Sequence, residues 1–330
     1  MHLPVPGLPI RPTCSSWLLR GALAIGALFA GMAEDARAAQ ADEPPPSPQA
    51  AGSDLGLGEA IILGIVEGAT EYLPVSSTGH LLVVERLLGI GDEESERRAA
   101  DAYAIFIQAG AILAVLWLYH ERVRLMLGGL AGREPDGLRL LVCLLLAFLP
   151  AAILGLLFRG AIKGYLFHPG PIAVAWFVGG AVILLFTRFK VRDHEAQGLE
   201  LTQLTPRMAI LIGLAQAFAL WPGISRSLVT IIGGVFLGLR LSAAVEFSFL
   251  LGLITLGAAT GWEALDEGQE MLGAYGWTGL VAGFVSAFIA AILSVKWMVA
   301  YLNWRELYLF GYYRILLAAF TAALLVLGLL

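Results

Sequence analysis

Two carboxylates stand within an apolar stretch of this chain, in the segment EGATEYLPVSSTGH (residues 67–80). Glu67 and Glu71 are four residues apart, so in a helix both side chains lie on one face and repel each other. Because a carboxylate at membrane depth is also costly, neither residue is expected to serve stability. A bound cation, a proton of the substrate or an opposing arginine would relieve the repulsion, and each indicates a functional site. The alternative is that Glu71 lies near an interface, where water solvates it.

The second half of this segment carries hydroxyl groups. Ser76, Ser77, Thr78 and Gly79 precede His80 and an apolar run, which places them at the N-terminus of a helix. Free backbone N–H groups and the positive end of the helix dipole make that position an anion site, and the hydroxyls add donors. His80 follows Ser77 by three residues, about one turn, so we expect it within reach of that hydroxyl. The alternative is ordinary N-capping.

A second segment, PGISRS (residues 222–227), opens another predicted helix with Arg226 in its first turn. A cation there opposes the helix dipole unless an anion shares the site. The alternative is that Arg226 pairs with Glu67 or Glu71 in a buried ion pair. If the two segments meet, their carboxylates, hydroxyls, histidine and arginine together fit a phosphate or diphosphate and leave residues for acid and base work.

Both segments lie at breaks in hydrophobic regions. Region Leu57–Gly89 is broken at Leu73–Gly79, and region Arg207–Gly238 is broken at Trp221–Ser227. A proline in each break removes a backbone donor and disfavours helix in the residue before it. Each region is therefore predicted to be a re-entrant helical hairpin, and its non-helical backbone must be buried in protein or line a wet cavity.

The two regions also resemble each other. Four pairs of residues are each 149 positions apart, namely Gly64 and Gly213, Glu67 and Gln216, Ser76 and Ser225, and Ser77 and Arg226. Three apolar stretches follow each region, and each is about long enough to span a bilayer. These six predicted spans are Ala102–Tyr119, Leu138–Phe158, Pro171–Thr187, Ser242–Trp262, Trp277–Leu302 and Tyr312–Leu330. The sequence therefore predicts an all-α polytopic membrane protein of two repeats, 57–188 and 189–330, each a re-entrant hairpin plus three transmembrane helices.

The charges of the loops predict the orientation. Residues 120–138 and 188–207 are rich in arginine and lysine, which places both on the cytoplasmic side. Residues 263–270 are expected to form a short outer loop, because they carry four carboxylates and no basic residue. On this count the first hairpin enters from outside and the second from the cytoplasm. Three spans per repeat is an odd number, so the repeats are predicted to be inverted, with hairpin tips meeting near the midplane.

The composition supports this class. Of the 330 residues 58% are apolar and 14% are charged, against roughly 25% charged in a soluble domain. A net charge of −5 without a basic stripe gives no support for nucleic-acid binding. Two cysteines, Cys14 and Cys143, are too few for a disulfide framework or a thiolate metal site.

The first residues of the chain differ from the rest. Arg11 and Arg20 precede an apolar stretch, Gly21–Ala33, that is too short to span, and Ala36–Ala38 offers a small-x-small cleavage site. We expect a signal peptide over residues 1–38 and a Pro-rich linker over 39–56. The alternatives are an uncleaved amphipathic anchor or a misassigned start codon.

Other polar residues in apolar helices are weaker candidates. Gln108 and Gln216 are expected to line the cavity or to hydrogen-bond between helices, and Glu246 to do either or to lie near the cytoplasmic interface. Four tryptophans near predicted span ends are expected to anchor at the interfaces: Trp262, Trp277, Trp297 and Trp304.

At the motifs Glu67–His80 and Pro222–Ser227 the chain resembles the undecaprenyl-diphosphate phosphatase family, also known as bacitracin-resistance proteins, and the similarity covers about Leu57–Leu330. The resemblance implies a multi-pass protein of the bacterial inner membrane with its active site open to the periplasm. It implies removal of the terminal phosphate from the C55 isoprenoid diphosphate, which recycles the carrier lipid for peptidoglycan synthesis and confers bacitracin resistance.

The resemblance also implies roles for single residues. Ser77 would be the nucleophile or key hydroxyl. The other catalytic residues would be Glu67, Glu71, His80 and Arg226, and the phosphate pocket would be lined by Ser76, Thr78, Gly79, Ser225, Ser227 and Thr230. One departure concerns the helix behind Arg226: the family often has Gly-Ala-Thr after SRS, and this chain has Leu228-Val229-Thr230.

Two mechanisms and a rival function stay open at this point. Ser77, deprotonated by His80 or Glu71, attacks phosphorus, or Glu67 and Glu71 hold Mg²⁺ or Ca²⁺ that activates water. No organic cofactor is expected, the partners are the isoprenoid lipid diphosphate and membrane lipids, and a homodimer is an open possibility. The alternative function is a lipid-phosphate flippase or a secondary anion transporter, because transporters share inverted repeats with broken helices.

Overall fold

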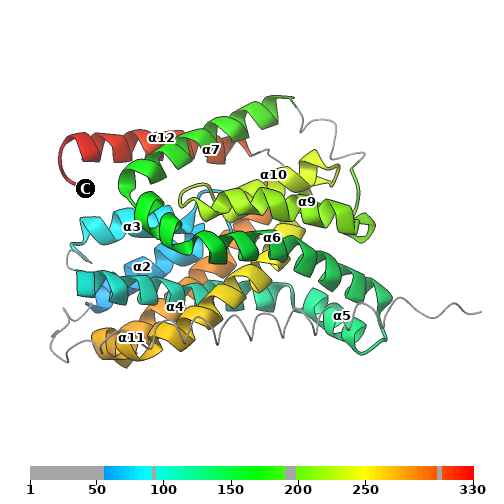
Figure 1. Cartoon of the computed structure of the whole chain (residues 1–330), viewed down its shortest axis with the longest axis horizontal. Helices are drawn as coiled ribbons and strands as arrows, with labels where there is room; N and C mark the ends of the chain where they lie inside the picture. Colours follow the sequence, from blue (N-terminus) through cyan, green and yellow to red (C-terminus); the bar gives the residue numbers. More distant parts are fainter. Residues whose placement is uncertain (1–55, 91–93, 190–197, 303–306) are drawn as a thin grey trace, which may run out of the picture. The chain divides into compact units, whose positions relative to one another are not determined.

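The computed structural model describes residues 56–90, 94–189, 198–302 and 307–330 (Figure 1). The described residues fall in one compact unit, residues 51–330, and are helical apart from turns and one isolated bridge between Leu199 and Leu239. The predicted signal peptide and all but the last residue of the predicted linker lie outside the described residues.

In the described part, six helical segments are long and apolar enough to cross a membrane, as predicted. They belong to α4 (Glu94–Leu118), α6 (Pro135–Leu166), α7 (Pro169–Phe189), α11 (Leu241–Leu302) and α12 (Tyr308–Val326). The candidate spans themselves are Ala100–Leu118, Pro135–Leu166, Pro169–Arg188, Leu241–Trp262, Gly276–Leu302 and Tyr308–Val326. Each covers most of a span expected from the sequence, because an apolar run of this length is the strongest signal a sequence carries.

The prediction of one loop is wrong. Residues 263–270, expected to form a short outer loop, are helical, and α11 is interrupted only at Gly276, with φ 59° and ψ 162°. Acidic residues do not break a helix, whereas glycine adopts this positive φ without a Cβ clash. The break in α11 therefore lies six residues beyond the acidic cluster, at the first residue of the span Gly276–Leu302.

Short helices form where the two broken regions were predicted. α2 (Leu57–Thr70) and α3 (Ser77–Leu87) flank the first break. α9 (Pro206–Gln216) continues into the 3₁₀ helix η2 (Ala217–Leu220), and α10 (Arg226–Phe236) follows the second break. Two further short elements, α5 (His120–Leu130) and the 3₁₀ helix η1 (Leu201–Gln203), lie in the segments expected to be cytoplasmic loops.

Small residues let the broken helices pack closely on long ones. α2 lies against α11, where a Cβ at Gly68 would overlap the carbonyl of Ala287. α9 lies against α6, where a Cβ at Gly213 would overlap the carbonyl of Ala147. Close backbone approach is the usual means of helix packing where apolar burial alone gives no driving force. α12 runs beside α7 (Figure 1).

Candidate active site

The two breaks contact each other directly. The hydroxyl of Ser227, at the start of α10, donates a 2.7 Å hydrogen bond to the carbonyl of Leu73 in the first break. Arg226 Nη2 lies 3.2 Å from Glu71 Oε1, so the two segments are also joined by a buried ion pair. The two motifs, residues 67–80 and 222–227, therefore form one cluster of side chains.

Each break ends on a serine with unusual backbone geometry. Ser76 has φ 71° and ψ 101° and caps α3, and Ser225 has φ 76° and ψ 116° and caps α10. They are the two non-glycine residues with positive φ in the described chain, a conformation that persists only where surrounding contacts enforce it. The two serines therefore share one strained conformation at two helix N-termini.

Glu71 connects the candidate nucleophile to the candidate anion-binding residue. Ser77 Oγ donates to Glu71 Oε2 while Arg226 holds the other carboxylate oxygen. Arg226 is itself fixed: Nη1 donates to the Ser248 carbonyl at 2.9 Å, and the guanidinium lies 5.4 Å from the centroid of the Tyr72 ring. Its Nε is buried and lacks a partner among the described residues, which leaves one donor of this arginine unused. The pairing of Arg226 with Glu71 is one of the alternatives weighed above.

Glu67 is the more deeply buried carboxylate, with 1% of its surface exposed. It interacts with Glu71 and Gln108, and its Oε1 has no hydrogen-bond partner in the described part of the chain. Gln108 in turn accepts from Thr260 at 3.2 Å, so it bridges two helices and borders the site. The two carboxylates thus neighbour each other, and Arg226 pairs with one of them, Glu71.

His80 does not reach the hydroxyl of Ser77, as the one-turn spacing suggested. Its Nδ1 lies 2.6 Å from the carbonyl of Ser76, and its Nε2 lies 2.7 Å from the hydroxyl of Tyr313. The ring also packs edge-on against Trp176, with centroids 5.2 Å apart. Both ring nitrogens therefore have partners other than Ser77, and the side chain that contacts the Ser77 hydroxyl is Glu71.

The residues expected to line a phosphate pocket are mostly engaged in building the breaks. Thr230 and Ser227 are fully buried, and the Thr230 hydroxyl bonds the Arg226 carbonyl and the Ser248 hydroxyl. Ser225 accepts from the Leu228 backbone as an N-cap, and Gly79 packs so tightly on Trp176 that a Cβ would clash. Thr78 is exposed.

Arg314 was not among the residues predicted for the site, although its side chain contacts both breaks. Its side chain is fully buried and donates to three carbonyls, those of Pro74 at 3.1 Å, Ala175 at 3.0 Å and Gly223 at 2.7 Å. Pro74 and Gly223 belong to the first and second break. The signal was available, because an arginine inside the predicted span Tyr312–Leu330 marks a functional or structural site by default.

Of the weaker candidates, Gln108 borders this cluster, and Glu246 and Gln216 have other partners. Glu246 pairs with Arg122 at 2.6 Å, and Gln216 accepts from Thr255 at 3.4 Å. In the part of the chain that the structure describes, no group of three or more His, Cys, Asp or Glu side chains is placed to hold a metal.

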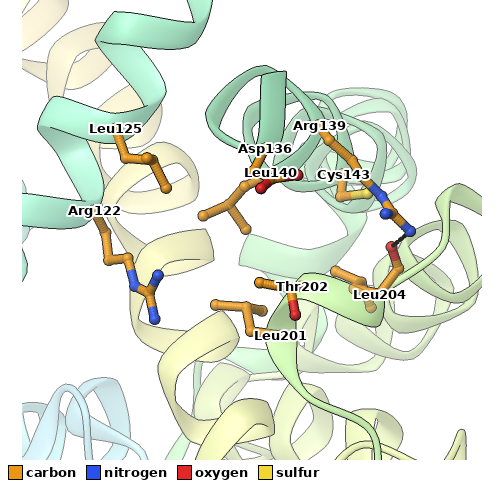
Figure 2. Close-up of a pocket in the computed structure, with 9 residues that line it drawn as sticks. All are labelled: Arg122, Leu125, Asp136, Arg139, Leu140, Cys143, Leu201, Thr202 and Leu204. Carbon is orange, nitrogen blue, oxygen red and sulfur yellow. Dashed lines mark hydrogen bonds between the residues drawn. The ribbon is translucent and has the colours of Figure 1, made fainter. Parts of the chain in front are cut away.

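A separate pocket lies between the segments expected to be cytoplasmic. Figure 2 shows Arg122 of α5, Asp136 and Arg139 of α6 and Thr202 of η1 around it. Arg139 donates to the Leu204 carbonyl at 2.9 Å, the hydrogen bond drawn there. None of the residues of the break cluster lines this pocket. Its position brings together two loops that the charge pattern assigns to the same side of the membrane.

Comparison with known proteins identifies close similarity over most of the chain. The family model described as "Bacitracin resistance protein BacA" matches residues 60–320. A protein of Sorangium cellulosum called "Undecaprenyl-diphosphatase" is 45% identical over 262 residues, which are 79% of this chain and 84% of that relative. A protein of Rhodospirillum rubrum called "Undecaprenyl-diphosphatase 2" is 45% identical over 258 residues, 78% of this chain and 90% of that relative.

Proposed function

Because the chain belongs to the bacitracin resistance protein BacA family, we propose that it hydrolyses undecaprenyl diphosphate to undecaprenyl phosphate and inorganic phosphate. The observation that carries this proposal is the line of contacts from Ser77 to Glu71 to Arg226. It unites a hydroxyl nucleophile, a base in contact with it and a cation for the phosphate. Simple binding of an anion would need only the last of these.

In the proposed mechanism Ser77 Oγ attacks the terminal phosphorus of the lipid diphosphate. The hydroxyl proton passes to Glu71, the P–O bond to the bridging oxygen breaks, and Glu71 gives this proton to the departing undecaprenyl phosphate. Water then attacks the phosphoserine, and the regenerated Glu71 carboxylate accepts a proton from it. The bond from phosphorus to Ser77 Oγ breaks, Glu71 returns the proton to Oγ, and inorganic phosphate is released. The transferring phosphoryl group carries its charge on its outer oxygens, so catalysis depends on cations and donors placed around them.

Arg226 is the residue best placed to supply that stabilisation. Its Nη1 is held by the Ser248 carbonyl and its ring contact with Tyr72 fixes its plane, whereas its Nε is unused. A guanidinium that is already oriented does not have to reorganise when negative charge develops on the phosphoryl group. The N-termini of α3 and α10, which begin at Ser77 and Arg226, add backbone N–H groups without intrahelical acceptors.

A divalent cation is a further element of the proposal. The unpartnered Oε1 of the buried Glu67 fits a metal ligand, and Mg²⁺ or Ca²⁺ takes oxygen ligands. Glu67 and Glu71 would hold the ion together with phosphate oxygens of the substrate, because two carboxylates do not complete its coordination. The ion would supply charge neutralisation beside the phosphate. Both oxygens of Glu71 already have partners in Ser77 and Arg226, so Glu67 would be its main protein ligand.

The proposal includes an inverted-repeat architecture with re-entrant hairpins. The matching positive φ of Ser76 and Ser225 supports it. The reciprocal packing of the two broken helices is a second support: α2 lies on α11 of the second half, while α9 lies on α6 of the first. A pseudo-twofold axis would produce this exchange, and it would bring both hairpin tips to the midplane.

We place the reaction on the outer face of the bacterial inner membrane, with the site open to the periplasm. The support is the distribution of basic residues in the two cytoplasmic loops and the outer start expected of a signal peptide. There the reaction would recycle the lipid carrier for peptidoglycan synthesis, and its activity would protect against bacitracin.

Phosphate release by purified protein from an isoprenyl diphosphate tests the proposal. Wild type should release phosphate, and Ser77→Ala, Glu71→Gln and Arg226→Met should each reduce the rate, the last by on the order of 10²- to 10³-fold. Trapping a phosphoserine at Ser77 would support the covalent route, whereas full activity of Ser77→Ala would exclude it. Lipid translocation in vesicles without phosphate release would indicate a flippase instead.

A further inference from the structure

His80 is held between two partners that fix which of its nitrogens carries the proton. The carbonyl of Ser76 can only accept, so the Nδ1 that lies 2.6 Å from it must be the donor. The ring is buried and, within the described part of the chain, has no carboxylate among its hydrogen-bond partners. These surroundings favour the neutral ring, in which Nε2 is an acceptor.

Tyr313 satisfies that acceptor. Its hydroxyl lies 2.7 Å from Nε2, and its ring is parallel to the imidazole within 2°, with centroids 5.7 Å apart. A tyrosine hydroxyl donates to an unprotonated nitrogen, so this contact stabilises the Nδ1–H tautomer. Free histidine prefers the other tautomer, which would present no donor to the Ser76 carbonyl.

The Ser76 carbonyl needs this donor because of its place in the chain. Ser76 carries the strained φ of 71° directly before Ser77, and among the described residues its carbonyl otherwise accepts from the His80 backbone alone, at 3.4 Å. Strain of this kind persists only where contacts over-determine it. A change of tautomer would remove the shorter of the two hydrogen bonds to the Ser76 carbonyl.

We propose that Tyr313 is a positioning residue for the reaction, which sets the tautomer of His80 and thereby holds the Ser76–Ser77 turn in its reactive geometry. This inference rests on the proposed function, because Ser77 is the nucleophile there. Tyr313 and His80 are 233 residues apart in sequence, so the contact makes the last span, α12, part of the frame of the first break. His80 then acts through the backbone of Ser76, and Glu71 is the base.

The first test is spectroscopic and does not depend on activity. The full chain, labelled with ¹⁵N at its five histidines, is measured in detergent, and the His80 signals are assigned by their loss in His80→Asn. We expect a protonated Nδ1 and an unprotonated Nε2 in wild type, and a gain of the Nε2–H form in Tyr313→Phe. A wild-type ring protonated at Nε2 alone would overturn the proposal.

The second test measures phosphate release from an isoprenyl diphosphate. Tyr313→Phe removes one hydrogen bond at constant ring volume, so kcat should fall about 3- to 10-fold with KM within twofold. The matched control is Tyr312→Phe, because Tyr312 is 59% exposed and should leave both parameters unchanged. Unchanged kcat in Tyr313→Phe would refute the positioning role. Absence of release by wild type would refute the proposed function, while the tautomer measurement would still decide the pairing.

Discussion

Replacing Arg314 by methionine removes the group that ties both breaks together while keeping a long apolar side chain. Three carbonyls lose a partner, those of Pro74, Ala175 and Gly223, at distances of 3.1, 3.0 and 2.7 Å. The guanidinium is fully buried, and Gly179 of α7 leaves the space that it fills, because a Cβ there would overlap it. Water therefore has little access to replace the lost donors.

The expected magnitude follows from these three hydrogen bonds. At about 1 kcal/mol each in protein interiors, or ~0.6 kcal/mol between membrane helices, they contribute ~2–3 kcal/mol. Relief from burying a charge offsets part of this loss. We therefore expect the thermal midpoint to fall by about 5 °C. We expect activity to fall on the order of 10²-fold, because two of the carbonyls immediately precede the turns that carry Ser77 and Arg226.

The assay combines a thermal melt in detergent with phosphate release at a temperature well below the midpoint. Arg207→Met is the matched control, because Arg207 is exposed in the first turn of α9. That change should alter stability by less than ~0.5 kcal/mol. Arg314→Lys keeps the charge but not the fork of donors, and it should recover only part of the loss. Wild-type melting and activity in Arg314→Met would refute the view that this arginine sets the geometry of the breaks.

Three further predictions concern packing, charge and metal. Gly68→Ala should destabilise the protein by ~1–3 kcal/mol, because the added methyl overlaps the Ala287 carbonyl. Gly58 has open space around it, so the control Gly58→Ala should be neutral or stabilising. Equal melting temperatures of the two variants would contradict the close approach of α2 and α11. Glu67→Gln should raise the free energy of unfolding by on the order of 0.5 kcal/mol, because it removes the repulsion between Glu67 and Glu71. The same change should lower the rate of phosphate release. A loss of stability on calorimetry would show that the two carboxylates do not repel each other. EDTA should abolish phosphate release, and added Mg²⁺ or Ca²⁺ should restore it. Glu67→Gln should need a higher concentration of the ion for the same recovery. A rate of phosphate release unaffected by EDTA would exclude a role for the metal.

The sequence was informative where a local physical rule decides the structure. The spans could be predicted because apolar length is a local property, and the breaks could be predicted because Pro74 and Pro222 cannot continue a helix. The contact of Arg226 with Glu71 was one of a few ways to balance a buried charge. These inferences required only neighbouring residues or a count of charges.

The remaining features depend on contacts between distant segments. The spacing of His80 suggested a contact with Ser77, but the ring faces Tyr313, 233 residues away, and no rule of spacing identifies that partner. Ser227 and Thr230 have the residue types of a phosphate pocket, yet their hydroxyls donate to backbone carbonyls. Ser227 donates to Leu73 in the other break, and Thr230 donates to Arg226 one turn earlier in α10. Hydroxyls of serine and threonine commonly bond nearby backbone groups in this way, so residue type alone does not identify a ligand site.

Arg314 and Arg226 both contact the breaks, but their guanidinium groups have different roles. Arg314 donates only to backbone carbonyls, so its contacts belong to the fold, and a substrate phosphate would have to break them to bind it. Arg226 shares one bond with the carboxylate of Glu71, and its Nε has no partner among the described residues, so an arriving phosphate would find both positions without disturbing the Ser248 contact. If phosphate displaced Glu71 from Arg226, the carboxylate would lose its cation at the moment when it must accept the proton of Ser77. Binding of the substrate would thereby free the Glu71 carboxylate beside Ser77, which couples recognition of the anion to activation of the nucleophile.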